Sequence, residues 1–241
     1  MEIRIEFEKR KVEIELYLEI LKTVNLDKAK LSGYDVTEDK NVELLFDAEK
    51  IKILTANSYL LIYNLVESTI YNSIVSIFDA ITDNGVKYFE MIKEVQKYWL
   101  NNLYKHDVNK KKETIIDTFM SIAVQIFDNT ISLASNEINY GGSLDAQTIF
   151  ETAKSMKIEI TNLQRMYDKN LHGSILVDIK KKRNWLAHGE KSFSEVGNNV
   201  PYSQIEDAKN AVIIFLKEYI NSVEVYINNQ QYKAIAPSLA N

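Results

Sequence analysis

Residues 44–81 read LLFDAEKIKILTANSYLLIYNLVESTIYNSIVSIFDAI and carry the longest apolar pattern of the chain. Leucine and isoleucine recur there at the three- and four-residue spacing of a helix, and Asp83-Asn84-Gly85 supplies a turn signal directly afterwards. The whole chain has only seven Gly and two Pro, so breaks are few. The stretch therefore predicts one long core helix and indicates an all-α fold, a helical bundle built around it.

A partly polar stripe runs along this predicted helix. Its members are spaced by three or four residues and lie on one line of the helix surface: Asn57, Leu60, Asn64, Glu67 and Tyr71. Polar groups on a buried helix cost free energy unless they are paired. We predict that Glu67 accepts from Arg183, and that Asn64 or Tyr71 lies beside Arg183 and His188. Alternatively, Glu67 satisfies another basic residue at the edge of the helix.

The remaining segments read as further helices joined by short breaks. Helical periodicity covers residues 4–24, 86–104, 113–136 and 203–228, whereas residues 28–39 read as a connector. Apolar residues of the third of these helices are assigned to the core: Ile116, Met120, Ala123, Phe127 and Ile131.

No repeat, low-complexity tract or linker divides the sequence, so residues 1–241 are expected to form a single domain. Residues 1–43 are expected to form an N-terminal helix and connector, and residues 44–136 the long core helices. Residues 141–188 read as short helices that end in the motif described below. Residues 189–202 read as an extended segment, and residues 203–228 as a C-terminal helix. Gly141-Gly142 breaks the chain, and Asp145 is expected to cap a short helix that ends before Ile158.

Composition narrows the function classes. The chain lacks Cys, which excludes thiolate metal sites and cysteine nucleophiles and fits a reducing cytoplasm. The charged N-terminus is unlike a signal peptide and no apolar run reaches membrane length, so we expect a cytoplasmic protein without a membrane partner. The net charge of -5 argues against a general nucleic-acid coat protein, although it permits a local basic site.

Known catalytic signatures are missing from the sequence. It has no phosphate-binding P-loop, no GxSxG and no GxGxxG after a strand. The three histidines, His106, His172 and His188, lack metal-ligand spacing. We therefore expect neither a metal ion nor a cofactor.

The reactive groups gather in residues 178–197, which read DIKKKRNWLAHGEKSFSEVG. A helix that begins near Ser174 places Arg183 at the edge of its apolar face and His188 about 140° away, with Asn184 and Ala187 between them. Gly189 suits the left-handed turn that ends a helix, so His188 belongs to the last turn.

Two neighbouring features extend this surface. Trp185 lies nearly opposite the apolar face, which indicates a second contact with a covering loop or another subunit. Residues 180–182 form a cluster of three lysines, Lys180, Lys181 and Lys182, beside Arg183. Such a cluster reads either as a solvated helix end or as a substrate contact, and its place next to His188 favours substrate.

The motif RNWLAHG followed by SFSEVG resembles the R-x4-6-H signature of HEPN domains, in particular the stand-alone bacterial MAE-type HEPN-like nucleases. Further similar stretches cover residues 53–72, 141–149 and 226–232. The resemblance implies an all-α homodimer whose two motifs face one cleft, and a metal-independent endoribonuclease of a defence or toxin-antitoxin system. A cognate antitoxin or other protein partner is also implied.

The residue types fit that chemistry. Histidine suits proton transfer, so His188 is predicted to act as general base or acid, while Arg183 holds the scissile phosphate of RNA. Asn184 is predicted to orient His188 or donate to phosphate, and the expected products are a 2',3'-cyclic phosphate and a 5'-hydroxyl. From spacing alone, His188 reads as a residue at the helix C-terminus that interacts favourably with the helix dipole. The alternative function is a non-catalytic HEPN dimer that binds RNA, a nucleotide or a cognate protein.

Residues 189–202 are predicted to be extended. They read as a lid, a dimer contact or a structural connector in which Phe193 plugs the core. We favour the connector for Phe193 and leave the role of Glu195 open.

Overall fold

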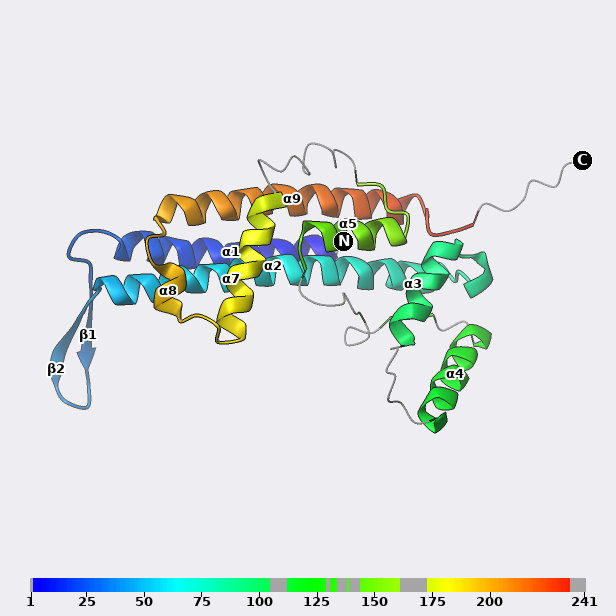
Figure 1. The fold of residues 1–241 in the computed structure, drawn as a ribbon, viewed down its shortest axis with the longest axis horizontal. Helices are drawn as coiled ribbons and strands as arrows, with labels where there is room; N and C mark the ends of the chain where they lie inside the picture. The colour runs from blue at the N-terminus through cyan, green and yellow to red at the C-terminus, as the bar shows by residue number, and fades with distance from the viewer. Residues whose placement is uncertain are drawn as a thin grey trace, which may run out of the picture. The chain divides into compact units, whose positions relative to one another are not determined.

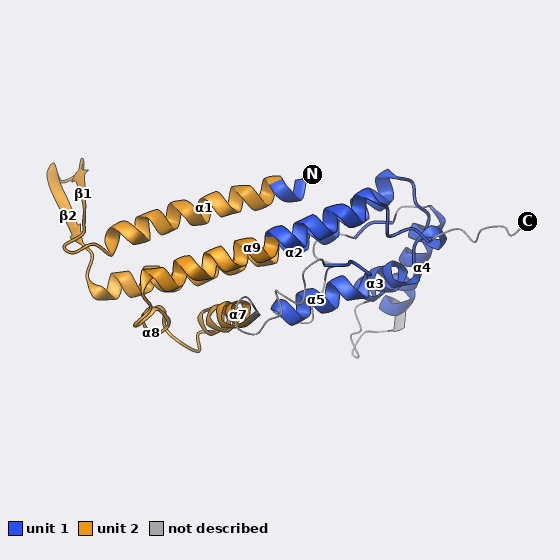
Figure 2. Cartoon of the chain, turned by 90° about the horizontal axis from the view of Figure 1, so that it is seen from above, with its two compact units in different colours: residues 1–4, 69–163, 217–241 blue, residues 5–68, 164–216 orange. Residues whose placement is uncertain are grey.

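The computed structural model describes residues 2–104, 112–128, 131–133, 138, 144–160 and 173–234. Predictions for Gly141-Gly142, His106 and His172 lie outside these ranges. The chain divides into two compact units, each assembled from separated stretches (Figure 2). Unit 1 comprises residues 1–4, 69–163 and 217–241, and unit 2 comprises residues 5–68 and 164–216.

The protein is a mostly helical bundle, as predicted, with the long core helix α2 over Ala48–Asp83 (Figure 1). Asp47 accepts from the Lys50 N–H at 3.0 Å and so caps the start of α2. At the other end Gly85 adopts φ +59, the left-handed conformation that the turn signal indicated. The helix therefore begins four residues later than predicted, because Leu44 and Leu45 belong to a strand.

Unit 2 holds the parts of α1, Glu2–Val24, and α9, Tyr202–Asn228, that pack with the first half of α2. Its buried side chains include Phe7, Leu18, Tyr59, Ile62, Tyr63, Ile205 and Phe215. Tyr17 Oη donates to Leu54 O at 2.7 Å, which ties α1 to α2. This unit also contains α7, Gly173–Ala187, and the short α8, Phe193–Gly197.

Unit 1 combines the second half of α2 with the end of α9 and with α3, Lys93–Leu103, α4, Lys112–Phe127, and α5, Ala146–Ser155. Trp99 is fully buried and its Nε1 donates to Ser132 O at 2.7 Å. Tyr226 Oη donates to Met156 O at 2.8 Å. Asp145 caps α5 by accepting from the Thr148 N–H, as predicted.

A β-hairpin corrects the predicted connector over residues 28–39. Strand β1, Lys30–Asp35, pairs antiparallel with β2, Lys40–Leu45. Asp35 accepts from the backbone N–H groups of Thr37 and Glu38, and Asp39 has φ +50, so local polar contacts close the turn. Mixed charge made β1 and the first part of β2 read as a connector, whereas Leu44 and Leu45 were assigned to the helix that follows.

Three other boundaries differ from the prediction. Residues 86–104 contain a short 3-10 turn, Tyr88–Glu90, followed by α3, because Met91 and Ile92 are extended. The segment 189–202, predicted to be extended, contains α8, because Ser192 and Glu195 form a capping box at its start. Helix α4 ends at Phe127 and does not reach residue 136.

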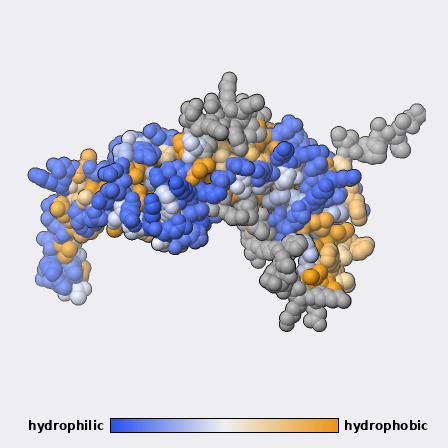
Figure 3. Space-filling view, viewed as in Figure 1, coloured by the Kyte–Doolittle hydropathy of each residue, from blue (hydrophilic) through white to orange (hydrophobic). Residues whose placement is uncertain are grey.

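The predicted burial of α4 is wrong for most of its apolar residues. Ile116, Met120 and Phe127 are 50, 62 and 86% exposed, whereas Ile131 beyond the helix is buried. Figure 3 shows apolar surface over this helix. Helical periodicity arises from the apolar face itself, whether or not another part of the same chain covers that face.

Helix α2 is long and apolar enough to cross a membrane when judged by length and composition alone, which corrects the expectation that no run reaches that length. Half of its most apolar window is buried in the structure. The buried half of this window is accounted for by its place in the core of the bundle.

Gly197 is the tightest backbone approach among the described glycines. A Cβ built at this position would lie 2.0 Å from Lys52 O in α2. We expect Gly197→Ala to lower the free energy of unfolding by about 1–3 kcal/mol, because a backbone carbonyl cannot move aside as a side chain can. Urea denaturation measures the change. Gly33→Ala is the control, since a Cβ there meets nothing within 4 Å, and equal stability of the two variants would contradict the close packing.

Candidate functional site

Helix α7 places the motif on the surface of unit 2. Leu176, Ile179 and Leu186 form its buried face, with Ile179 1% exposed. The helix runs from Gly173 to Ala187 and so begins one residue before the predicted start. Its polar residues reach α2, where Tyr59, Tyr63 and Glu67 receive them.

Two of the backbone hydrogen bonds at the end of α7 define how the helix terminates. The Glu190 N–H donates to Trp185 O at 2.9 Å and the Gly189 N–H donates to Leu186 O at 3.4 Å, while Gly189 has φ +69. This is the Schellman arrangement, in which Gly189 takes the left-handed position, as predicted. His188 precedes that glycine and is exposed to solvent.

Arg183 is fixed on three sides. Its Nη2 lies 3.7 Å from Glu67 Oε1, so the predicted pairing of these residues is present as an ion pair. The guanidinium carbon lies 4.7 Å from the centre of the Tyr63 ring, and Nη1 donates to Asn184 Oδ1 at 3.2 Å. The side chain remains 28% exposed. A planar cation is thus held on an aromatic face and still reaches solvent.

Tyr63 is the contact that the sequence did not reveal. It is 1% exposed and reads as an ordinary core aromatic. Tyr63 precedes Glu67 by four residues, so both lie on the same face of α2. A residue on α7 that pairs with Glu67 is therefore expected to lie near Tyr63, and this spacing is the signal that could have revealed the contact.

Other residues of the polar stripe have different surroundings. Asn64 is exposed on α2, one turn before Glu67. Tyr71 belongs to unit 1, so its predicted place beside Arg183 stays a prediction. The Tyr71 hydroxyl is buried and has no hydrogen-bond partner among the described residues.

The family model described as HEPN_MAE_28990-like HEPN matches residues 2–232. The chain belongs to this HEPN family. No curated protein and no solved structure matches the chain. The family suggested by the motif is thereby confirmed over nearly the whole chain.

The lysine cluster of the HEPN domain is divided by its contacts. The Lys182 side chain is 12% exposed, and its Nζ contacts Asp178 Oδ2 at 2.7 Å and Tyr59 Oη at 2.8 Å. Burial alone lowers the pKa of Lys182, but the hydrogen bonds to Asp178 and Tyr59 outweigh burial and raise it. Lys180 is half-buried and Lys181 is exposed. Lys181 is therefore the member with the freest access to solvent.

The segment that follows the HEPN motif is anchored locally. Glu195 accepts from the Ser192 N–H and hydroxyl, each at 2.7 Å, and these bonds lower the pKa of Glu195. Phe193, predicted to plug the core, is half-buried, while Val196 is 5% exposed. The connector function of the segment thus rests on Val196 and Gly197 more than on Phe193.

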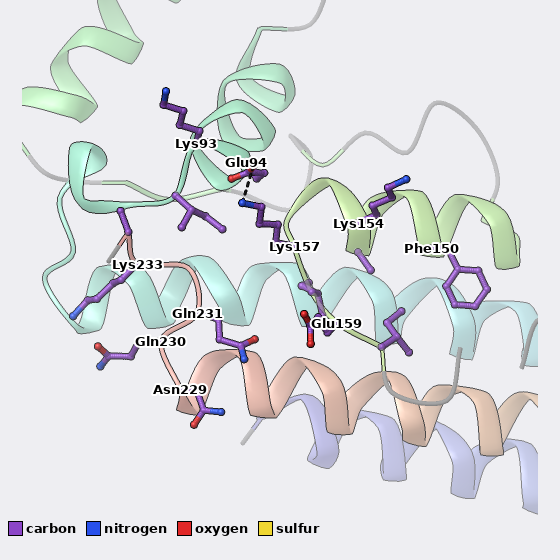
Figure 4. Close-up of a pocket in the computed structure, with 15 residues that line it drawn as sticks. Lys93, Glu94, Phe150, Lys154, Lys157, Glu159, Asn229, Gln230, Gln231 and Lys233 are labelled. Carbon is purple, nitrogen blue, oxygen red and sulfur yellow. Dashed lines mark ion pairs between the residues drawn. The ribbon is translucent and has the colours of Figure 1, made fainter. Parts of the chain in front are cut away.

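A separate pocket of about 1390 Å³ lies within unit 1. Its lining comes from the start of α3, from α5 and residues 157–160 that follow it, and from residues 229–231, 233 and 234 after α9 (Figure 4). Lys157 pairs with Glu94 at 3.0 Å on its wall. None of the predicted site residues lines it, so we place the candidate site on α7. Within the described ranges, no three His, Cys, Asp or Glu side chains gather as metal ligands.

Proposed function

We propose that this HEPN protein is a metal-independent endoribonuclease whose active site is formed by Arg183, Asn184 and His188. The proposal rests on the positions of two side chains near the end of α7, the anchored guanidinium of Arg183 and the exposed imidazole of His188. Arg183 is held by Glu67 and Tyr63, whereas His188 is exposed about one and a half turns later. Ribonucleases are common in the HEPN family, which supports the same reading.

The chemistry requires two proton transfers and one stabilised anion. A base removes the proton of the ribose 2'-hydroxyl, whose oxygen attacks the adjacent phosphorus, and the bond to the 5'-oxygen breaks as that oxygen accepts a proton. His188 supplies one of these proton transfers. Arg183 faces the charge that develops on the phosphate oxygens. The products are a 2',3'-cyclic phosphate and a 5'-hydroxyl.

Asn184 acts through Arg183 in this proposal. Its Oδ1 accepts from Arg183 Nη1, and its backbone carbonyl accepts from the His188 N–H at 2.9 Å. The Asn184 side chain therefore contacts the guanidinium of Arg183, whereas its backbone contacts only the backbone of His188. The arrangement fits a positioning role for Asn184.

A homodimer completes the mechanism. One imidazole cannot be both base and acid in the same step, so the His188 of a second copy would supply the other proton transfer. Lys180, Lys181 and Lys182 are proposed to attract the RNA backbone despite the net charge of -5. A bacterial defence or toxin-antitoxin setting in the cytoplasm, with a cognate antitoxin, belongs to the same proposal.

Incubation of the purified protein with end-labelled RNA in EDTA tests the function. We expect RNA to be cut and the upstream fragments to carry cyclic phosphate, while a DNA strand of the same sequence stays intact because it lacks the attacking hydroxyl. Cleavage that requires an added divalent metal would contradict the mechanism. RNA that is bound but left intact would support the non-catalytic HEPN dimer.

A further inference from the structure

Trp185 gathers two lysine side chains on the outer surface of α7. The Lys181 Nζ lies 4.8 Å from the centre of the indole and the Lys191 Nζ lies 3.7 Å from it. Lys181 precedes Trp185 by one helical turn, whereas Lys191 comes from the chain that returns after Gly189. The Lys191 N–H also donates to Trp185 O at 3.4 Å. The ring thus fixes two cations from two segments.

The position of this cluster follows from helical geometry. At about 100° per residue, Lys181 and Trp185 lie about 20° and 60° beyond His188, on the side away from Arg183. Around the helix axis His188 therefore lies between Arg183 and Trp185. Along the axis Trp185 precedes His188 by about 4.5 Å and Arg183 by about 7.5 Å, so one RNA strand can reach all three from the same helix end.

Neither ammonium group is taken up in a close ion pair, although Lys191 and the Glu195 carboxylate attract each other at longer range. Neither Lys181 nor Lys191 forms an ion pair within the described part of the chain, unlike Lys182 and Arg183. Glu195 is the acid that Lys191 influences, but its carboxylate is already used by Ser192. Two neighbouring cations on exposed surface repel each other, and an anion between or beside them relieves that repulsion.

We propose that Lys181, Trp185 and Lys191 form a subsite for the phosphodiester backbone of single-stranded RNA next to the phosphate that is cleaved. The two ammonium groups contact phosphate, and Trp185 is a positioning residue that holds them beside His188. The inference rests on the proposed function in one respect, since the RNA that contacts this subsite is the same strand that the proposed active site cleaves. Its test needs binding and not cleavage.

The salt dependence of RNA binding measures these contacts directly. A short fluorescein-labelled single-stranded RNA is titrated with the full-length His188→Ala protein at several salt concentrations, with and without Lys181→Gln/Lys191→Gln. Each lost phosphate contact is expected to reduce the slope of log affinity against log salt by about 0.7, and so by about 1.4 for the pair. The matched control is Lys9→Gln/Lys22→Gln, which removes the same charge from α1 and leaves the slope unchanged.

The positioning role of Trp185 has its own readout. Trp185→Leu keeps every charge but removes the ring, and we expect RNA affinity to fall about two- to fivefold for each cation released, with rescue by Trp185→Phe. An unchanged salt slope in the double lysine variant, or the absence of RNA binding, would overturn the subsite. If the slope falls while wild-type protein leaves RNA intact, the subsite stands and the nuclease proposal fails. If wild type cuts RNA and the slope is unchanged, the reverse holds.

Discussion

Replacement of His188 by alanine is expected to lower the single-turnover rate of RNA cleavage by about 100- to 10,000-fold, the usual contribution of one general acid or base. His188 is exposed at the end of α7, so the substitution should change the free energy of unfolding by no more than about 0.5 kcal/mol. Loss of cleavage with an unchanged fold separates a chemical role from a structural one. The rate of disappearance of labelled RNA in EDTA measures the effect.

Glu190→Gln is the matched control for His188→Ala. Glu190 is also exposed and lies two residues later in the same turn. We expect this variant to cut RNA at close to the wild-type rate. If His188→Ala cuts as fast as wild type and only its melting temperature falls, His188 merely favours the helix dipole, and the catalytic assignment is wrong.

Arg183→Ala is expected to lower the same rate by about 100- to 1000-fold, which is typical of removing one group that stabilises a developing anion. The side chain is 28% exposed and touches Tyr63 and Glu67, so its loss also leaves a carboxylate without its partner. Arg183→Lys keeps the charge but not the planar fork or the stacking on Tyr63. It should recover only part of the rate.

Glu67→Gln separates the direct role of the Arg183 cation in cleavage from the role of Glu67 in holding that cation. It removes the ion pair while Arg183 and its contact with Tyr63 remain. We expect a smaller loss of rate than in Arg183→Ala, because the cation itself is retained. An equal loss in the two variants, with both proteins folded by circular dichroism, would show that Glu67 and not Arg183 carries the effect.

The local chemistry of the site could be read from the sequence. A carboxylate on a largely buried helix needs a cation, and Glu67 meets Arg183 for that reason. A glycine directly after the motif histidine indicates a helix end, and Gly189 adopts the left-handed conformation. Such rules depend on the chemistry of one or two side chains and not on the rest of the fold.

Tertiary contacts were harder to predict. Tyr63 beneath Arg183 and Lys191 against Trp185 depend on how α2 and the returning chain approach α7, and no local spacing specifies that approach. The β1–β2 hairpin was not predicted, in part because Leu44 and Leu45 also fit the helical pattern that follows them. Helix α4 shows the opposite limit, since its apolar spacing predicted the helix but not the exposure of Phe119 and Phe127.

We propose that Arg183 and His188 form one active site. Its most direct test is the single-turnover rate of Arg183→Ala/His188→Ala on labelled RNA in EDTA, measured beside both single variants and wild type. Residues that serve one step are strongly non-additive, so we predict a double variant about as slow as the slower single variant. A double variant that cuts RNA at the wild-type rate would place the chemistry outside Arg183 and His188.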